Sequence, residues 1–161
     1  MSYILETVKQ EQPEGCVFCR MLAEDDDARN LILVRAAHCF VVMNLFPYNS
    51  GHLMVIPVRH TADFGSLTPA EHTELGRLLD VSRLALAECF TPHGFNIGMN
   101  IGRAAGAGIL DHLHYHIVPR WNGDSNFMSA VGETKVLSES LPESFRRLKQ
   151  VFDRLLNAHH A

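Results

Sequence analysis

Short hydrophobic runs and longer amphipathic stretches alternate along the chain and predict its secondary structure. Runs rich in β-branched and aromatic residues, bounded by glycine, proline, asparagine or serine, are typical of strands. Five such runs predict strands over residues 31–35, 39–43, 51–58, 95–101 and 109–119. Apolar residues at helical spacing occur in two longer stretches and predict two main helices.

Both main helices begin with recognisable capping residues. Thr68-Pro69-Ala70-Glu71 fits a capping box with proline at the first helical position and predicts a helix over residues 69–90. Ser140-Leu141-Pro142-Glu143 predicts the start of a second capped helix. The apolar face of that helix consists of Phe145, Leu148, Phe152 and Leu155. A shorter helix is expected over residues 16–23, and the acidic run 24–27 is expected to be a solvated turn.

Five strands and two main helices predict an α+β fold with one mostly antiparallel sheet. The short connection between the last two strands favours a hairpin over a parallel crossover. No internal repeat or linker interrupts the pattern, so residues 1–161 are predicted to form one domain. Residues 1–15 are expected to form a loose N-terminal arm.

Composition narrows the class of protein. With 47% hydrophobic and 20% charged residues, the chain can bury an ordinary core. The net charge of −4 argues against a general nucleic-acid-binding protein, which needs a basic surface. No apolar run approaches the roughly 18 residues of a membrane span, and no signal peptide is recognisable. A cytoplasmic protein without a membrane partner is therefore expected, with its four cysteines as thiols or metal ligands.

Three histidines alternate with apolar residues in the last predicted strand, as His112-Leu113-His114-Tyr115-His116. Alternate side chains of an extended strand share a face, so the imidazoles are predicted to lie on one face, roughly 6.5–7 Å apart. Leu113, Tyr115 and Ile117 lie on the other face and can pack on the core. Imidazoles placed in this way need hydrogen-bond partners or a metal.

Covalent catalysis is the function that this histidine pattern favours. A neutral imidazole can attack phosphorus, form a phosphoramidate and then depart when a second acceptor arrives. A solvated strand face and a metal site formed by all three histidines are the alternatives. Adjacent histidines on a flat strand rarely converge on one tetrahedral centre, which disfavours the metal site.

A glycine-rich turn, Gly102-Arg103-Ala104-Ala105-Gly106-Ala107-Gly108, leads into the histidine strand. Its backbone N–H groups are candidates for binding phosphate oxygens. Arg59, Arg103 and Arg120 are candidates for supplying positive potential, although such arginines are more often solvated surface residues.

Cys16-Val17-Phe18-Cys19 has the two-residue gap of a zinc knuckle. A redox-active pair is the alternative, but such a pair is expected after a strand of a βαβ unit, which the pattern here does not show. Zinc requires two further ligands, for which His60 and His112 are plausible candidates. Cys39 and Cys89 occupy apolar periodic positions and are predicted to be buried thiols.

The run from His112 to Arg120 resembles the signature of the histidine-triad family, in which three histidines are separated and then followed by apolar residues. Asn44 stands eight residues before His52, as that family's pattern expects. The likeness covers roughly residues 16–121. It implies a histidine-triad fold, a homodimer and a small nucleotide as binding partner.

The resemblance also implies roles for individual residues. His114 is the expected nucleophile, His116 is expected to help bind and activate the phosphate, and His52 is the additional active-site histidine. Nucleotide contacts are expected from the ribose-binding Asn44, the strand around Val42, Asn100 and the turn Gly106, Ala107 and Gly108.

Zinc-bearing branches of the family, and the related hexose-phosphate uridylyltransferases, combine a Cys-x-x-Cys pair with two histidines. Carried over position by position, the resemblance implies a structural zinc ion held by Cys16, Cys19, His60 and His112. The three histidines then need not share one role, because His112 can hold the metal while His114 reacts.

Residues 44–52, 92–98 and 119–127 resemble the branch of bacterial diadenosine tetraphosphate phosphorylase-like proteins. The implied function is nucleotidyl transfer or hydrolysis at the α-phosphorus of a dinucleoside polyphosphate, through a covalent nucleotidyl-histidine. A nucleoside phosphoramidate hydrolase and a non-catalytic nucleotide-binding module remain alternatives. In the turn, Ala107, Gly108 and Ile109 stand where many members carry Gln, Ser or Thr, so the phosphates would depend on backbone N–H groups.

Overall fold

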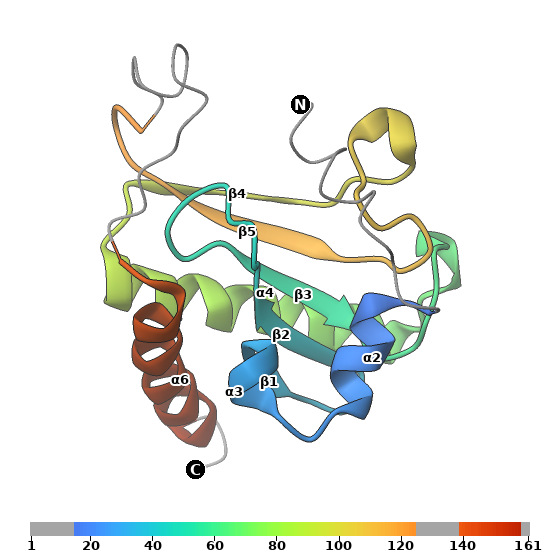
Figure 1. Ribbon diagram of the computed structural model, residues 1–161, viewed down its shortest axis with the longest axis horizontal. Helices are drawn as coiled ribbons and strands as arrows, with labels where there is room; N and C mark the ends of the chain where they lie inside the picture. The colour runs from blue at the N-terminus through green and yellow to red at the C-terminus, as the bar shows by residue number, and fades with distance from the viewer. Residues whose placement is uncertain (1–14, 125–138, 159–161) are drawn as a thin grey trace.

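The computed structural model describes residues 15–124 and 139–158 (Figure 1). Its strands are β1 (Ile32–Arg35), β2 (Cys39–Met43), β3 (Leu53–Pro57), β4 (Gly94–Gly98) and β5 (Tyr115–Arg120). Its helices are α2 (Val17–Ala23), α3 (Asp27–Asn30), α4 (Pro69–Phe90) and α6 (Leu141–Ala158), with short 3-10 helices η1 (Phe64–Ser66) and η2 (Arg103–Ala105). The expected arm up to residue 14 and the motif residues 125–127 lie outside the described residues.

The strands form one antiparallel sheet in the order β1-β2-β3-β5-β4. The predicted α+β fold is confirmed, as are its two main helices α4 and α6 and the antiparallel pairing of β4 with β5. No helix in the described part of the chain is long and apolar enough to cross a membrane.

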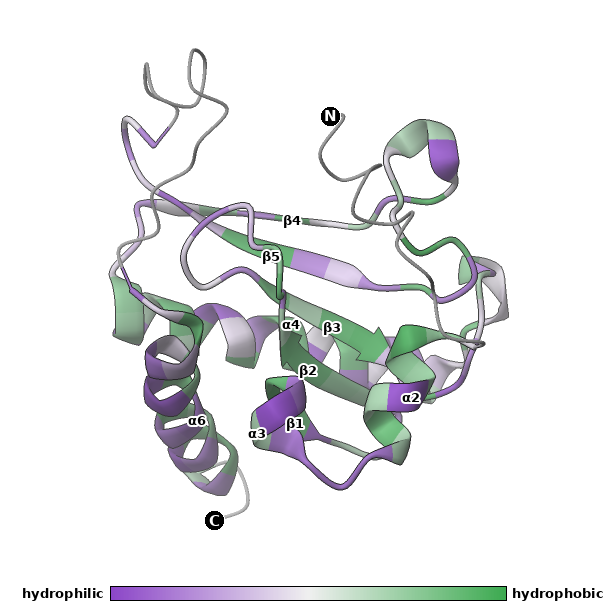
Figure 2. Ribbon diagram, viewed as in Figure 1, coloured by the Kyte–Doolittle hydropathy of each residue, from purple (hydrophilic) through white to green (hydrophobic). Residues whose placement is uncertain are grey.

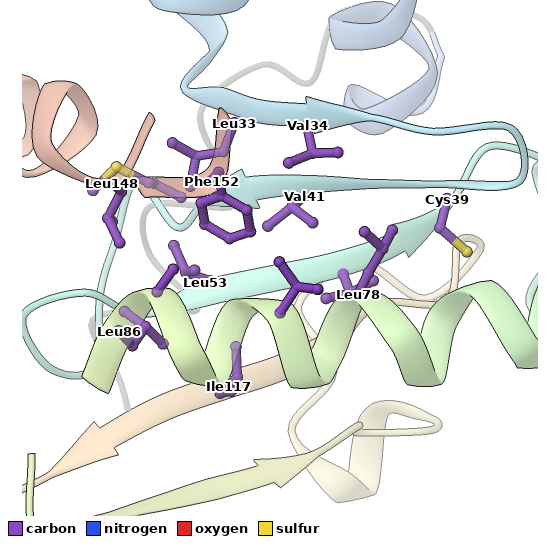
Figure 3. Close-up of a cluster of buried hydrophobic side chains, with 14 of the residues drawn as sticks. Leu33, Val34, Cys39, Val41, Leu53, Leu78, Leu86, Ile117, Leu148 and Phe152 are labelled. Carbon is purple, nitrogen blue, oxygen red and sulfur yellow. The ribbon is translucent and has the colours of Figure 1, made fainter. Parts of the chain in front are cut away.

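The main hydrophobic core lies between one face of the sheet and helices α4 and α6 (Figure 3). Alternate residues of the strands point into it, as period-two patterning requires. Its fully buried members include Leu33, Val41, Leu53, Leu78, Leu86, Ile117, Leu148 and Phe152. Figure 2 shows β2 and β3 as strongly hydrophobic, while much of the visible surface of α6 is hydrophilic.

The opposite face of the sheet carries α2 and the histidines. In Figure 1, α4 passes behind the strands whereas α2 lies in front of them. Phe18 of α2 is 2% exposed and belongs to a second buried cluster. The other buried members of that cluster come from the first three strands and are Ile32, Phe40, Val42, Met54 and Ile56.

Helix α4 begins with the predicted capping box. The Thr68 hydroxyl accepts from the Glu71 N–H at 3.2 Å, and the Glu71 carboxylate accepts from the Thr68 N–H at 2.7 Å. The same carboxylate receives two N–H groups of Arg59, each at 2.9 Å. Glu71 therefore ties the segment that follows β3 to the start of α4.

Gly51 brings the chain close to α4 just before β3. Its φ is +75°, and a Cβ there would lie 2.8 Å from the Leu86 side chain and 3.0 Å from the Phe90 ring. Glycine is the residue that accepts both the left-handed backbone and the close approach. This turn delivers the next residue, His52, onto the face opposite the main core.

The last strand is shorter than predicted, because β5 begins at Tyr115 rather than at residue 109. Pairing with β3 starts at the pair Val55 and Tyr115. Before that point the Leu113 N–H binds the Thr61 carbonyl, and the His112 ring binds the Pro57 carbonyl. These bonds take the chain out of the ladder, so His112 and His114 precede the strand rather than lie in it.

Two smaller predictions also need correction. The acidic run does not end in a solvated turn, because Asp26 caps the short helix α3 by accepting from the Arg29 N–H at 3.1 Å. Asp27 pairs with Arg35 of β1 at 2.7 Å. Cys39 is fully buried as predicted, whereas Cys89 is only partly buried.

Candidate active site and metal centre

Cys16, Cys19, His60 and His112 meet beside the start of α2. Their ligand atoms all lie within 4.8 Å of one another. The Nδ1 atom of His112 is 3.3 Å from Cys16 Sγ and 3.7 Å from Cys19 Sγ, and His60 Nδ1 is 3.3 Å from Cys19 Sγ. A tetrahedral zinc ion, with bonds of about 2.3 Å to sulfur and 2.0–2.1 Å to nitrogen, would separate such atoms by about 3.6 Å. The cluster therefore has the dimensions of a metal site.

The hydrogen bonding of His112 also suits a metal ligand. Its Nε2 lies 2.8 Å from the Pro57 carbonyl oxygen, which can only accept, so Nε2 carries the proton. The lone pair of Nδ1 then faces the two sulfur atoms. Burial lowers the pKa of His112, and burial together with Cys16 raises the pKa of Cys19. Metal binding would require the thiols to lose their protons, because the thiolate is the form of cysteine that binds a metal.

His114 is 6% exposed and adjoins this centre. Its Nδ1 lies 2.9 Å from the carbonyl oxygen of His112 and must donate to it. Burial lowers the pKa of His114, which favours the neutral ring. The neutral tautomer then has its lone pair on Nε2, the atom from which an imidazole attacks.

His52 and His116 form a second pair of linked imidazoles. Strand register explains their meeting, because His116 lies opposite Met54 of β3, two residues beyond His52. The Tyr48 N–H donates to His52 Nδ1 at 3.0 Å, so the proton of neutral His52 is on Nε2. That nitrogen lies 2.9 Å from His116 Nδ1 and donates to it. Neutral His116 consequently carries its own proton on Nε2.

The environment of His116 keeps its ring neutral. Burial lowers its pKa to about 4, and the neighbouring His114 contributes in the same direction. The ring centroids of His114 and His116 are 5.0 Å apart. A lone pair on Nε2 of His114 and an N–H group on Nε2 of His116 thus lie on neighbouring rings.

A cavity of about 360 Å³ opens beside His116. Gly98 of β4 lies directly opposite His116 in the sheet, and its missing side chain leaves space there. The other lining residues are mostly polar: Tyr48, Asn49, Asn96, Ile97, Met99, Asn100, Val118 and Arg120. Of the residues that line the cavity, the sequence predicted Asn100 and His116 as site residues and Arg120 as a source of positive potential. Tyr48 and Asn49 lie between Asn44 and His52, and this position in the motif could have indicated that they belong to the site.

The predicted nucleotide-binding residues lie in different surroundings. Val42 is fully buried in the cluster beneath α2. The Asn44 amide donates to His52 Nδ1 at 3.3 Å, and its carbonyl accepts from the Phe46 N–H. A Cβ on Gly106 would lie 3.8 Å from the Asn100 amide nitrogen. The glycine turn therefore adjoins Asn100, and its residues Ala107 and Gly108 are partly or fully exposed.

Two of the three candidate arginines have carboxylate partners. Arg59 binds Glu71, so its charge holds the fold together at the start of α4. Arg120 lines the cavity, but Asp124 receives its guanidinium at 2.6 and 2.8 Å. Arg120 also donates to Asn96 at 2.7 Å. Positive potential at the cavity is therefore reduced by Asp124.

The model of the HIT domain family matches residues 26–123, well over half of the chain. The chain belongs to the HIT family. The AP-4-A phosphorylase of Mycobacterium tuberculosis is 40% identical over 152 residues, covering 92% of this chain and 78% of that protein.

Solved structures agree with the family assignment. A Zn-bound histidine triad family protein from Mycobacterium smegmatis is 28% identical, with a TM-score of 0.71 over 89% of this chain and 97% of that one. The diadenosine triphosphate hydrolase of Plasmodium falciparum, solved with Cyclomarin A, is 18% identical, with a TM-score of 0.63 over 96% and 95% of the two chains. The second likeness bears on the fold alone.

Proposed function

We propose that this HIT-family protein is a nucleotide-processing enzyme acting at the α-phosphorus of a dinucleoside polyphosphate such as diadenosine tetraphosphate. Family membership and the 40% identity to an AP-4-A phosphorylase support the substrate class. The observation that carries the chemistry is the 2.9 Å hydrogen bond from His114 Nδ1 to the His112 carbonyl. It leaves the Nε2 lone pair of a neutral, buried imidazole available for attack.

In the first step, His114 Nε2 forms a bond to the α-phosphorus. The P–O bond to the departing nucleoside polyphosphate breaks, and its oxygen keeps the electron pair. His114 becomes cationic, and the His112 carbonyl stabilises that charge through the Nδ1 proton. The Nε2 proton of His116 is available to a phosphoryl oxygen, since His116 Nδ1 already accepts from His52.

In the second step, an oxygen of water or inorganic phosphate attacks the phosphorus of the His114 adduct. The P–N bond breaks and its electron pair returns to Nε2. Water loses a proton to solvent and yields a nucleoside monophosphate, whereas inorganic phosphate yields a nucleoside diphosphate. Either acceptor regenerates the neutral ring.

Substrate contacts are proposed for the residues around this centre. Asn44 is proposed to bind ribose hydroxyls, and the β2 strand around Val42 to form a wall of the base pocket. Asn100 and the backbone of Gly106, Ala107 and Gly108 are proposed to lie along the phosphates. The proximity of Gly106 to the Asn100 side chain supports a common phosphate-binding surface.

We further propose that the metal centre holds zinc. Two thiols and two imidazoles at these separations form a common structural zinc set. Bound zinc would hold the start of α2 to the segments that follow β3 and precede β5. It would supply structural support for the histidines and take no part in bond breaking.

Phosphate dependence tests the proposed reaction. With diadenosine tetraphosphate, a phosphorylase forms ATP and ADP and is faster with inorganic phosphate, whereas a hydrolase forms ATP and AMP without it. Turnover of nucleoside phosphoramidates alone would instead favour a phosphoramidate hydrolase. Nucleotide binding without any turnover or trapped adduct would favour a non-catalytic module.

His114→Ala tests the covalent step. Turnover should fall by roughly 10³-fold or more, because the attacking nitrogen is removed, while nucleotide binding stays measurable by calorimetry. His72→Ala is the matched control, since His72 is exposed on α4 and should leave turnover unchanged. Near-normal activity of His114→Ala would exclude the covalent mechanism.

A further inference from the structure

Phe18 occupies an unusual position between the two cysteines of the metal centre. It lies in the first turn of α2, two residues after Cys16 and directly before Cys19. Its side chain is buried against the sheet, whereas the two cysteines are only partly buried. A metal bound to both cysteines would therefore fix the turn that carries Phe18.

The Phe18 ring contacts two of the three histidines. Its centroid is 5.5 Å from the His112 ring, edge to face, and 5.3 Å from the His114 ring at an interplanar angle of 57°. One aromatic side chain thus touches a metal ligand and the expected nucleophile at once. Contacts of this kind hold both rings at preferred angles.

A hydrogen bond provides a second link between the metal centre and His114. The carbonyl group that receives the His114 Nδ1 proton belongs to His112, itself a member of the metal cluster. The hydrogen bond fixes one edge of the His114 ring, and the Phe18 ring restrains its rotation from the side. The first restraint comes from His112, a member of the metal cluster, and the second from Phe18, which lies between Cys16 and Cys19.

We propose that Phe18 is a positioning residue that couples the metal centre to His114 and sets the direction of the His114 Nε2 lone pair. The proposal rests on the proposed function, in which that nitrogen is the nucleophile. Misplacing a reacting atom by about 1 Å can cost roughly 100-fold in rate. Phe18 would therefore influence the rate of the chemical step without touching the reacting phosphorus.

Phe40 provides a matched control in the same hydrophobic cluster. It is fully buried, and its ring centroid lies 6.5 Å from that of Phe18. Within residues 15–124 and 139–158, its ring contact is with Phe18 and not with a histidine. Phe40→Leu removes a comparable ring from the core, including its contact with Phe18, but keeps the Phe18 ring that contacts His112 and His114, so it measures the cost of losing a buried ring from this cluster.

The test compares Phe18→Leu and Phe18→Met with Phe40→Leu, each loaded with zinc and assayed on diadenosine tetraphosphate. Leucine and methionine remove the ring but keep an apolar side chain. We expect kcat of both Phe18 variants to fall at least about tenfold below that of Phe40→Leu, with KM within about threefold of wild type. Equal kcat values, or a loss confined to KM, would overturn the proposal.

Nuclear magnetic resonance of the histidine rings provides a readout that does not depend on turnover. In the wild-type protein, the carbon-bound protons of His114 should show through-space contacts to the Phe18 ring. Replacing Phe18 should shift these signals, and replacing Phe40 should leave them in place. Removing the metal from the wild-type protein should shift them in the same sense as replacing Phe18.

The two measurements separate the two proposals. If the wild-type protein turns over no dinucleoside polyphosphate, the proposed function fails and the His114 signals alone decide the role of Phe18. Should a Phe18 variant fail to fold, the through-space contacts and the effect of metal removal are measured on the wild-type protein. In either case, the coupling would be overturned if no through-space contacts between His114 and Phe18 were found, or if the His114 signals did not change when the metal was removed.

Discussion

At the scale of single residues, neighbouring imidazoles differ because each faces a different partner. The His112 ring donates to the Pro57 carbonyl and turns its lone pair to the thiols. The His114 ring donates to a backbone carbonyl and keeps its lone pair on the outer nitrogen. The Nδ1 atom of His116 accepts from His52, so the proton of neutral His116 is on Nε2. Hydrogen bonding therefore gives the three rings different unpaired nitrogens, as their proposed roles of metal ligand, attacking group and donor require.

The lowered pKa of His116 predicts a pH dependence of stability. Its pKa is about 4 in the folded protein and about 6.5 in an unfolded chain, so the unfolded state binds the proton first as the pH falls. Stability should therefore decrease between pH 6.5 and pH 4, with His116 contributing at most about 3 kcal/mol. Urea unfolding of the wild type and of His116→Gln measures this. An equal pH slope in both proteins would contradict the prediction.

At the scale of elements, the start of α4 depends on one carboxylate. Glu71 completes the capping box with Thr68 and neutralises Arg59, which precedes the metal-centre residue His60. The hydrogen bonds from Arg59 and Thr68 lower the pKa of Glu71 to about 2. A helix terminus and the segment carrying a metal ligand are therefore stabilised by the same side chain.

Glu71→Gln should destabilise the protein at neutral pH by about 2–3 kcal/mol, because it removes the charge that binds Arg59. The folded-state pKa lies below the ordinary value of 4.5, so this stabilisation is complete above about pH 4.5 and is lost as the pH falls toward 2. Chemical unfolding of the variant and the wild type at neutral pH and at pH 2 measures this difference in stability. Thr68→Ala provides a control that loses only the cap, at a cost of about 1 kcal/mol. A deficit for Glu71→Gln that persists at pH 2 would contradict the assignment.

At the scale of the whole molecule, the two faces of the sheet differ in what covers them. Helices α4 and α6 cover one face with an apolar core, while α2, the metal cluster and the histidines lie on the other. Strand β4 ends the sheet, and Ile97 on it is 48% exposed. An edge strand can pair with a second copy, which supports the homodimer that remains a prediction.

The metal centre should contribute to the stability of the whole fold, because it joins segments distant in sequence. Zinc at 100 times its dissociation constant would add about 2.7 kcal/mol to the free energy of unfolding. Cys19→Ser should lose the metal, measured by mass spectrometry, and unfold at a lower temperature. Cys89→Ser lies outside the cluster and should keep the metal. A Cys19→Ser protein with full metal content and unchanged stability would exclude the site.

Features that depend on local periodicity can be predicted from the amino-acid sequence alone. The capping box at Thr68, the apolar faces of α4 and α6 and the strand pattern are all readable, because helix and strand periods act on neighbouring residues. The alternation of histidines with apolar residues likewise indicated chemistry near His114. The family resemblance supplied the expected roles of His52 and of the metal ligands.

The meeting of side chains that are distant in sequence becomes visible in the folded structure. His52 reaches His116 because β3 and β5 pair in one register. Strand β5 starts late because the Leu113 N–H bonds to the Thr61 carbonyl and the His112 ring to the Pro57 carbonyl. The cavity beside His116 depends on the same long-range packing. Contacts across 50 or more residues reflect chain topology, whereas a local pattern specifies only which face of an element each residue occupies.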